Sequence, residues 1–193
     1  MRIVAGRHRG RRLEAPEGLG VRPTADRTRE AVFNILTGGR LDWRGGGESP
    51  TNPLIGARVL DAFAGTGALG LEALSRGAGH VTFMESQAAA LAVCRHNVSA
   101  LDEEARASVL QADVLRPPPA PAPCHLVLMD PPYGQDMATP ALRALRAAGW
   151  IAPGAIVTVE LMAREPFAAP EGFSVVDERK YGKARVVFLQ ALG

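Results

Sequence analysis

The residues best suited to chemistry are Asp130, Pro131, Pro132 and Tyr133, which follow the apolar run 126–129. The apolar run is typical of a buried strand, and two consecutive prolines end it. Because a residue before proline is pushed into an extended conformation, the end of this strand is predicted to be stiff. It offers the Asp130 carboxylate and the Pro131 carbonyl as acceptors beside the flat ring of Tyr133. Such a site can hold the amino group of a nucleobase.

A second candidate site follows an earlier predicted strand. Residues 61–70 contain a Gly-x-Gly-x-x-Gly pattern at the junction of a predicted strand and a predicted helix. Glycines there allow a tight turn and close approach of a ligand. By itself the pattern does not distinguish dinucleotides from other nucleosides. The residues predicted to contact a cofactor in this loop are Asp61, Phe63, Ala64, Gly65, Thr66 and Gly67.

Two further carboxylates follow the next two predicted strands. Glu85 is placed to accept both hydroxyls of a ribose, and Asp113 to accept a hydrogen bond from an adenine amino group. Their neighbours Ser86 and Val114 complete the predicted cofactor site. NAD would require a pyrophosphate on the helix N-terminus, whereas S-adenosylmethionine has no phosphate and carries an ammonium group. Asp61 is a candidate acceptor for that ammonium. The motif at 130–133 decides for S-adenosylmethionine, because it is absent from dinucleotide sites and suits amine methylation; no metal is required.

Alternating strand and helix patterns position these groups. The predicted strands cover residues 59–63, 81–84, 108–110, 126–130, 155–161, 173–179 and 184–190, and the predicted helices cover 68–76, 87–101 and 139–148. This alternation predicts an α/β fold with a doubly wound, mostly parallel, seven-stranded sheet. The last two strands form a hairpin, which adds an antiparallel strand at the sheet edge.

The start of the chain is basic. Residues 1–40 hold nine arginines against four acids, while the remaining residues carry a net charge of −3. This asymmetry favours a polyanion partner for the N-terminal segment. We predict an arginine-rich hairpin over 2–15 and a helix beginning near Thr24. The expected division is an N-terminal extension over 1–43, a flexible linker over 44–56 and the main domain over 57–193.

Composition limits the class of protein. The chain has 193 residues, of which 47% are hydrophobic, enough for one core. No run approaches the roughly 20 apolar residues of a membrane helix, and the first residues do not form a secretory signal. Cys94 and Cys124 form no motif and are expected to be reduced thiols. We therefore expect a cytoplasmic protein, without a membrane partner, that works as a monomer.

Together these motifs resemble S-adenosylmethionine-dependent methyltransferases that modify exocyclic amines of nucleobases. More narrowly, the chain resembles the bacterial 16S ribosomal RNA guanine-N2 methyltransferases (RsmD-type). The resemblance rests on residues 2–11, 22–34, 61–76 and 130–133, and it covers nearly the whole chain. One departure is Gln87, where that family often has an acid.

The resemblance implies methyl transfer to the N2 amine of a guanine in 16S ribosomal RNA, either naked or in an assembling small ribosomal subunit. Asp130 and Pro131 would accept the two N–H bonds and direct the nitrogen lone pair, and Tyr133 would stack on the base. The motif at 130–133 is shared with DNA adenine-N6 and cytosine-N4 amino-methyltransferases, which remain the alternative. The residues expected to hold RNA phosphates are Arg7, Arg9, Arg11, Arg12, Arg22, Arg27, Arg29, Lys180 and Lys183.

Overall fold

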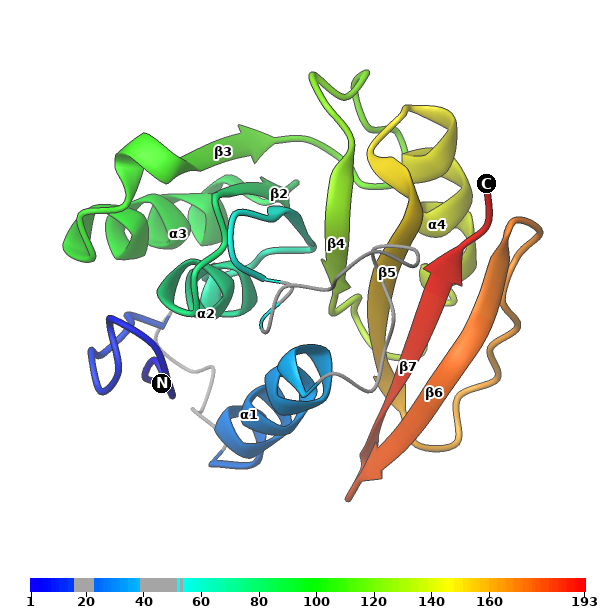
Figure 1. Ribbon diagram of the computed structural model, residues 1–193, viewed down its shortest axis with the longest axis horizontal. Helices are drawn as coiled ribbons and strands as arrows, with labels where there is room; N and C mark the ends of the chain where they lie inside the picture. The colour runs from blue at the N-terminus through cyan, green and yellow to red at the C-terminus, as the bar shows by residue number, and fades with distance from the viewer. Residues whose placement is uncertain (16–22, 39–51, 53) are drawn as a thin grey trace.

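A seven-stranded sheet forms the centre of the protein, in the order β3-β2-β1-β4-β5-β7-β6 (Figure 1). The structure, a computed structural model, describes residues 1–15, 23–38, 52 and 54–193. The strands are β1 (Arg58–Ala62), β2 (His80–Glu85), β3 (Ala107–Gln111), β4 (Cys124–Met129), β5 (Ile151–Met162), β6 (Phe173–Tyr181) and β7 (Ala184–Ala191). β7 pairs antiparallel with both β5 and β6, and the other neighbouring strands pair in parallel. The predicted α/β class with a mostly parallel sheet is confirmed.

The order of the strands reverses between β1 and β4. From β1 the chain moves outward through β2 and β3, and then returns to place β4 on the other side of β1. Both β2 and β4 pair with β1 in parallel. Connections after β1 and β4 therefore leave in opposite directions, which opens a crevice at the carboxyl ends of these two strands. Ligands of open parallel sheets bind at this position.

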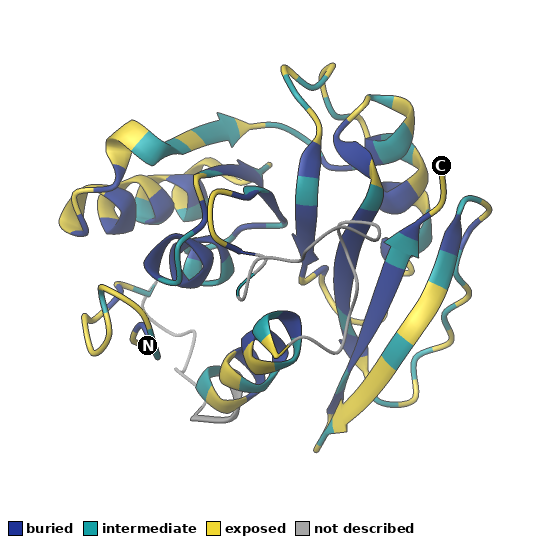
Figure 2. Cartoon of the chain, viewed as in Figure 1, coloured by how far each residue is buried: buried dark blue, intermediate teal, exposed yellow. Residues whose placement is uncertain are grey.

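Helices cover the two faces of the sheet. They are α1 (Pro23–Thr37), α2 (Ala68–Ser75), α3 (Ala88–Ala100) and α4 (Ala138–Ala147), with a short 3-10 helix over Glu104–Arg106. One core cluster joins α1, α2 and α3 to alternate residues of β4 such as Leu128. The other joins α4 and Trp150 to the intervening residues such as Val127. Because successive strand residues point to opposite faces, β4 is buried on both sides (Figure 2).

The basic N-terminal segment packs onto the main sheet. A single antiparallel bridge joins Arg2 and Arg12, so the predicted hairpin is a turn rather than a pair of full strands. Ile3 and Leu13 are buried in the same cluster as α2. Most of the predicted linker, 44–56, lies outside the described residues. The described residues on its two sides share one core.

The observed elements differ from the predicted ones mainly at their ends. Helix α1 begins at Pro23 rather than Thr24, because proline suits the first helical position. Strand β5 begins at Ile151, four residues before the predicted start, and a register irregularity against β4 accommodates the extra length. Among the described residues, no helix is long and apolar enough to cross a lipid bilayer.

Candidate active site

The glycine-containing loop is tied to the end of β1. The carboxylate of Asp61 is buried, and its Oδ2 accepts the backbone N–H of Gly70 at 2.7 Å. Gly67 has a φ of 81°, which favours glycine, and a Cβ at Gly70 would lie 2.4 Å from the ring of Phe83. Phe63 also has a positive φ, of 63°. Such strained backbone at a non-glycine residue is concentrated at functional sites.

Glu85, at the end of β2, connects this loop to the next helix. Its Oε2 accepts the N–H of Gly65 at 3.0 Å, and its Oε1 accepts the N–H of Gln87 at 2.8 Å. Carboxylate oxygens have more than one lone pair, so both can accept further hydrogen bonds from a ligand. The remaining predicted residues lie at the same edge of the sheet: Ala64 is buried, Thr66 is half-buried and Ser86 is exposed.

Asp113 and Val114 follow β3 at the edge of the sheet. Asp113 Oδ1 accepts the N–H of Leu115 at 2.9 Å, and Oδ2 lies 3.6 Å from Arg116 Nε. The Asp113 side chain remains 43% exposed, so a ligand can reach it. Val114 is buried in the core cluster on the α4 face. The loop after β1, Glu85 and Asp113 thus lie at the carboxyl ends of three neighbouring strands.

The segment after β4 carries acceptors into the same edge. Asp130 is exposed, Pro131 is buried, and Pro132 is exposed. Tyr133 is 40% exposed, and its hydroxyl donates a hydrogen bond to Glu160 Oε1 at 2.6 Å. Glu160 lies near the end of β5.

Glu160 was not among the residues predicted from the sequence. The available signal was an acid within the apolar run 155–161, near the carboxyl end of a predicted strand. That position corresponds to those of Glu85 and Asp130 on their own strands.

Three carboxyl groups at this edge have raised pKa values. Asp130 is open to solvent on one side, but protein surrounds the rest; this burial, with the nearby Glu160 carboxylate, raises its pKa to about 7. Burial also raises the pKa of Glu160, against the hydrogen bond from Tyr133. Burial raises the pKa of Asp61 well above its usual range, the Gly70 N–H lowers it, and the Asp130 and Glu85 carboxylates add to the rise.

The charges at this edge of the sheet indicate which cofactor fits. Within the described part of the chain, no arginine, lysine or histidine forms an ion pair with Asp61, Asp130 or Glu160. Clustered carboxylates without cations would repel a pyrophosphate and attract a positively charged ligand. S-adenosylmethionine carries a sulfonium and an ammonium group, so the residues present fit it. Asp61 is enclosed by the loop, so it can act on an ammonium through its field rather than by direct contact.

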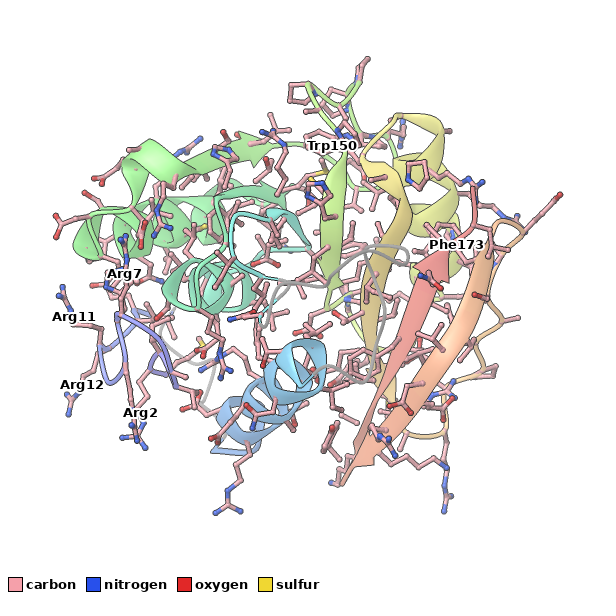
Figure 3. All side chains as sticks on the ribbon, in the orientation of Figure 1. Arg2, Arg7, Arg11, Arg12, Trp150 and Phe173 are labelled. Atoms are coloured by element: carbon pink, nitrogen blue, oxygen red, sulfur yellow. The ribbon has the colours of Figure 1, made fainter. Side chains whose placement is uncertain are left out.

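The predicted phosphate-binding residues divide into exposed and internal groups. Arg9, Arg11, Arg12, Arg27, Lys180 and Lys183 are exposed. Figure 3 shows the side chains of Arg11 and Arg12 extending outward from the N-terminal turn. Arg11 also donates to the carbonyl of Ala100 at 2.5 Å. Arg22 lies outside the described residues.

Two of the predicted arginines are engaged within the protein. Arg29 is only 4% exposed and pairs with Asp26 and Glu72. This burial leaves no guanidinium surface for a phosphate, which argues against the predicted role of Arg29. Arg7 pairs with the buried Glu103, although its own side chain is 52% exposed.

Comparison with known proteins identifies relatives along the full chain. The family model described as conserved hypothetical protein 95 matches residues 1–190. The ribosomal RNA small subunit methyltransferase D of Haemophilus influenzae is 33% identical over 187 residues, covering 94% of this chain and 89% of that protein.

Solved structures share the fold of this chain. Escherichia coli yhhF superposes with a TM-score of 0.80 at 28% identity, covering 100% of this chain and 98% of that one. The Thermus thermophilus 16S rRNA N2 G1207 methyltransferase, solved with AdoMet and guanosine, has a TM-score of 0.64 at 22% identity. That match covers 91% of this chain and 44% of that one, and it shows a shared fold alone.

Proposed function

This chain belongs to the conserved hypothetical protein 95 (RsmD) family of ribosomal RNA methyltransferases, and we propose that it methylates the N2 amine of a guanine in 16S ribosomal RNA. The methyl donor in this proposal is S-adenosylmethionine. The substrate is the RNA itself or an assembling small ribosomal subunit in the cytoplasm, and the enzyme acts as a monomer.

The observation that carries this proposal is the position of Asp130. It follows β4 at the reversal of strand order, where the carboxyl ends of β1 and β4 lie side by side. Its carboxylate interacts electrostatically with Asp61, at the base of the glycine-containing loop. A base bound at Asp130 would therefore lie next to a cofactor bound at that loop.

The cofactor would be held by residues from three strands. The backbone of residues 63–67 would line its amino acid portion, Glu85 would accept the ribose hydroxyls, and Asp113 would accept from the adenine amino group. When bound, S-adenosylmethionine supplies a methyl group activated by its positively charged sulfur. The carboxylates at this edge would favour that charge.

The protein's own contribution is to orient the amine. The lone pair of an exocyclic amine is delocalised into the purine ring, which makes the nitrogen a poor nucleophile. If the Asp130 carboxylate and the Pro131 carbonyl accept its two N–H bonds, the nitrogen becomes pyramidal and its lone pair is directed to the methyl group. Orientation of this kind can contribute about 7–11 kcal/mol. Asp130, with a pKa of about 7, is also suited to take up the proton that the methylated amine releases.

Tyr133 would hold the base in place. Its half-exposed ring offers a stacking surface beside Asp130, which by analogy is worth about 1–3 kcal/mol. The exposed arginines of the N-terminal turn would bind phosphates around the target nucleotide.

A methyl-transfer assay tests this function. Purified protein is incubated with methyl-labelled S-adenosylmethionine and, separately, 16S RNA, small subunits and DNA from a strain that lacks the protein. We expect label in one of the ribosomal substrates, and nucleoside mass mapping should identify N2-methylguanosine at one position. Label in DNA alone, or in another base, would refute the proposal.

A further inference from the structure

Glu160 places a second carboxylate beside Asp130. Strands β4 and β5 run parallel, with Met129 opposite Val159. The next residues along the chain are Asp130, directly after β4, and Glu160 in β5. Neighbouring strands lie about 4.8 Å apart, and residues at matching register point to the same face. The electrostatic effect of Glu160 on Asp130 agrees with this proximity. In Figure 1, β4 and β5 descend side by side to this edge.

Tyr133 fixes one oxygen of Glu160. The Tyr133 hydroxyl donates to Oε1. Each oxygen of an ionised carboxylate has two lone pairs, so Oε2 can accept a hydrogen bond from a ligand. The same contact holds the Tyr133 ring in position next to the two carboxylates, where a stacked base would present its edge to them.

Guanine is the base whose edge matches two adjacent acceptors. Next to its N2 amine lies the ring N1–H, so this edge presents donors from both positions. In adenine the ring N1 beside the N6 amine has a lone pair, and in cytosine the ring N3 beside the N4 amine has one. An ionised carboxylate only accepts hydrogen bonds, so it would repel either lone pair.

We propose that Glu160 is a specificity residue whose carboxylate accepts the N1–H of the target guanine while Asp130 accepts an N–H of the N2 amine. This inference rests on the proposed function and names the group that selects guanine over adenine and cytosine. It also gives Tyr133 two roles, stacking on the base and orienting the carboxylate that reads its edge.

The electrostatics of the pair support this arrangement. Burial raises the pKa of both Asp130 and Glu160, and among the described residues no cation compensates them. Two N–H donors on one rigid base would stabilise both ionised forms together. In a base whose ring nitrogen beside the amine has a lone pair, that lone pair would face the negatively charged Glu160 carboxylate.

The test uses RNA in which the mapped target guanine is replaced by 2,6-diaminopurine. This base keeps the N2 amine but has a lone pair at N1 in place of N1–H. RNA carrying either base is prepared by ligation, and methylation rates are measured at a pH well above 7. The wild-type enzyme should favour guanine by roughly 10- to 100-fold, the discrimination expected from one hydrogen bond to a charged group.

The variant E160Q should reduce this preference by roughly 10-fold, because a carboxamide can turn its NH2 toward the N1 lone pair. E160A should reduce it as well, since it removes the repulsion. The variant Y133F should weaken the preference less than E160A does, because it keeps the carboxylate but removes the hydroxyl that orients it. Any effect of the altered group at position 6 is shared by all variants and cancels in the comparison.

The outcomes separate this inference from the proposed function. Wild-type enzyme that methylates both RNAs equally would overturn the role of Glu160 without any variant. An unchanged preference in folded E160Q and E160A would also overturn it, while guanine methylation by the wild type would still support the proposed function. Wild-type enzyme that methylates no guanine in any ribosomal substrate would overturn the proposed function itself.

Discussion

Two groups of carboxylates in this protein differ in whether cations compensate them. Glu72 in α2 is fully buried, accepts the N–H groups of Val4 and Ala5, and pairs with Arg29 and Arg76. At the ends of β4 and β5, by contrast, no ion pair to Asp130 or Glu160 is found among the described residues. The first arrangement holds the N-terminal segment on the main sheet, and the second leaves negative charge available to a ligand.

Glu103 extends the first group. Its buried carboxylate receives Arg106, His8 and Arg7. Burial alone would raise the pKa of Glu103, but the hydrogen bonds from these side chains outweigh it and lower the pKa. Asp130 shows the opposite shift because burial raises its pKa and the Glu160 carboxylate adds to the rise. Glu72 and Glu103, which cations compensate, stabilise the fold, whereas Asp130 and Glu160, which pair with no cation among the described residues, lie at the candidate site.

Replacing Asp130 should produce the largest change in activity. Asp130→Asn removes the charge and proton acceptor while keeping the size of the side chain. We expect methyl transfer to fall by at least about 100-fold, the lower end of what a general base contributes. Single-turnover transfer and calorimetric binding of S-adenosylmethionine measure the two effects separately. Cofactor binding should persist because Asp130 acts on the base, and full transfer activity would refute the mechanism.

Replacing Glu72 should produce the largest change in stability. Glu72→Gln leaves Arg76 without its counter-charge and Arg29 with Asp26 alone, and breaking a buried pair in this way costs about 3–5 kcal/mol. Urea denaturation measures the free energy of unfolding. Glu171→Gln, at an exposed position, is the matched control and should change it little. If Glu72→Gln were as stable as the control, the distinction between the two groups would fail.

The rate of methyl transfer should depend on pH through Asp130. Transfer needs ionised Asp130, whose pKa is about 7, so the rate should rise from acidic pH and level off above that value. Below it, each pH unit should cost about tenfold. A rate independent of pH between 6 and 8 would contradict this assignment.

The linked effect on folding follows from the same shifts. Because the folded-state pKa of Asp130 is raised from 3.8, the stability it contributes is present below 3.8 and is lost as pH rises through about 7. Glu103 has a lowered folded-state pKa, so its contribution is present above 4.5 and is lost as pH falls through the folded pKa. Unfolding measured across pH in Asp130→Asn and wild type isolates the first contribution.

Local patterns in the sequence predicted the fold correctly, and they indicate one edge of the sheet as the candidate site. The apolar run 126–129 and the prolines after it define a strand and its end, and strand–helix alternation implies that Asp61, Glu85 and Asp130 share one edge. What these patterns do not contain is contact between distant segments. The pairing of Glu72 with Arg29 depends on how α1 packs against α2. From the sequence alone, Arg29 is one arginine in a basic stretch and was therefore predicted to bind an RNA phosphate.

Glu160 was missed for a related reason. Its proposed role follows from the register of β5 against β4, which brings it beside Asp130 across 30 positions of sequence. Within its own strand it is one polar residue among apolar ones, with no motif around it. Pairing register, rather than residue pattern, assigns it to the site.

Arginines can also be compared by whether a carboxylate within the protein already pairs with them, and the expected effect of replacing an exposed one is smaller. Arg29 is buried against Glu72, whereas Arg12 is exposed on the N-terminal turn (Figure 3). If Arg12 binds an RNA phosphate, Arg12→Gln should weaken RNA binding and reduce the slope of log K against log salt by about 0.7–0.9. Filter binding of 16S RNA over a range of salt concentrations measures this slope.

Arg116→Gln is the control for this last variant. Arg116 is 90% exposed beside Asp113, and it lies outside the N-terminal segment. Its replacement should leave the salt slope unchanged, because an exposed arginine that contacts no phosphate releases no counterions on binding. An equal change in both variants would mean that net charge attracts the RNA in general. A change in Arg12→Gln alone would assign the phosphate contact to the N-terminal turn, and thereby separate its exposed arginines in function from the buried Arg29.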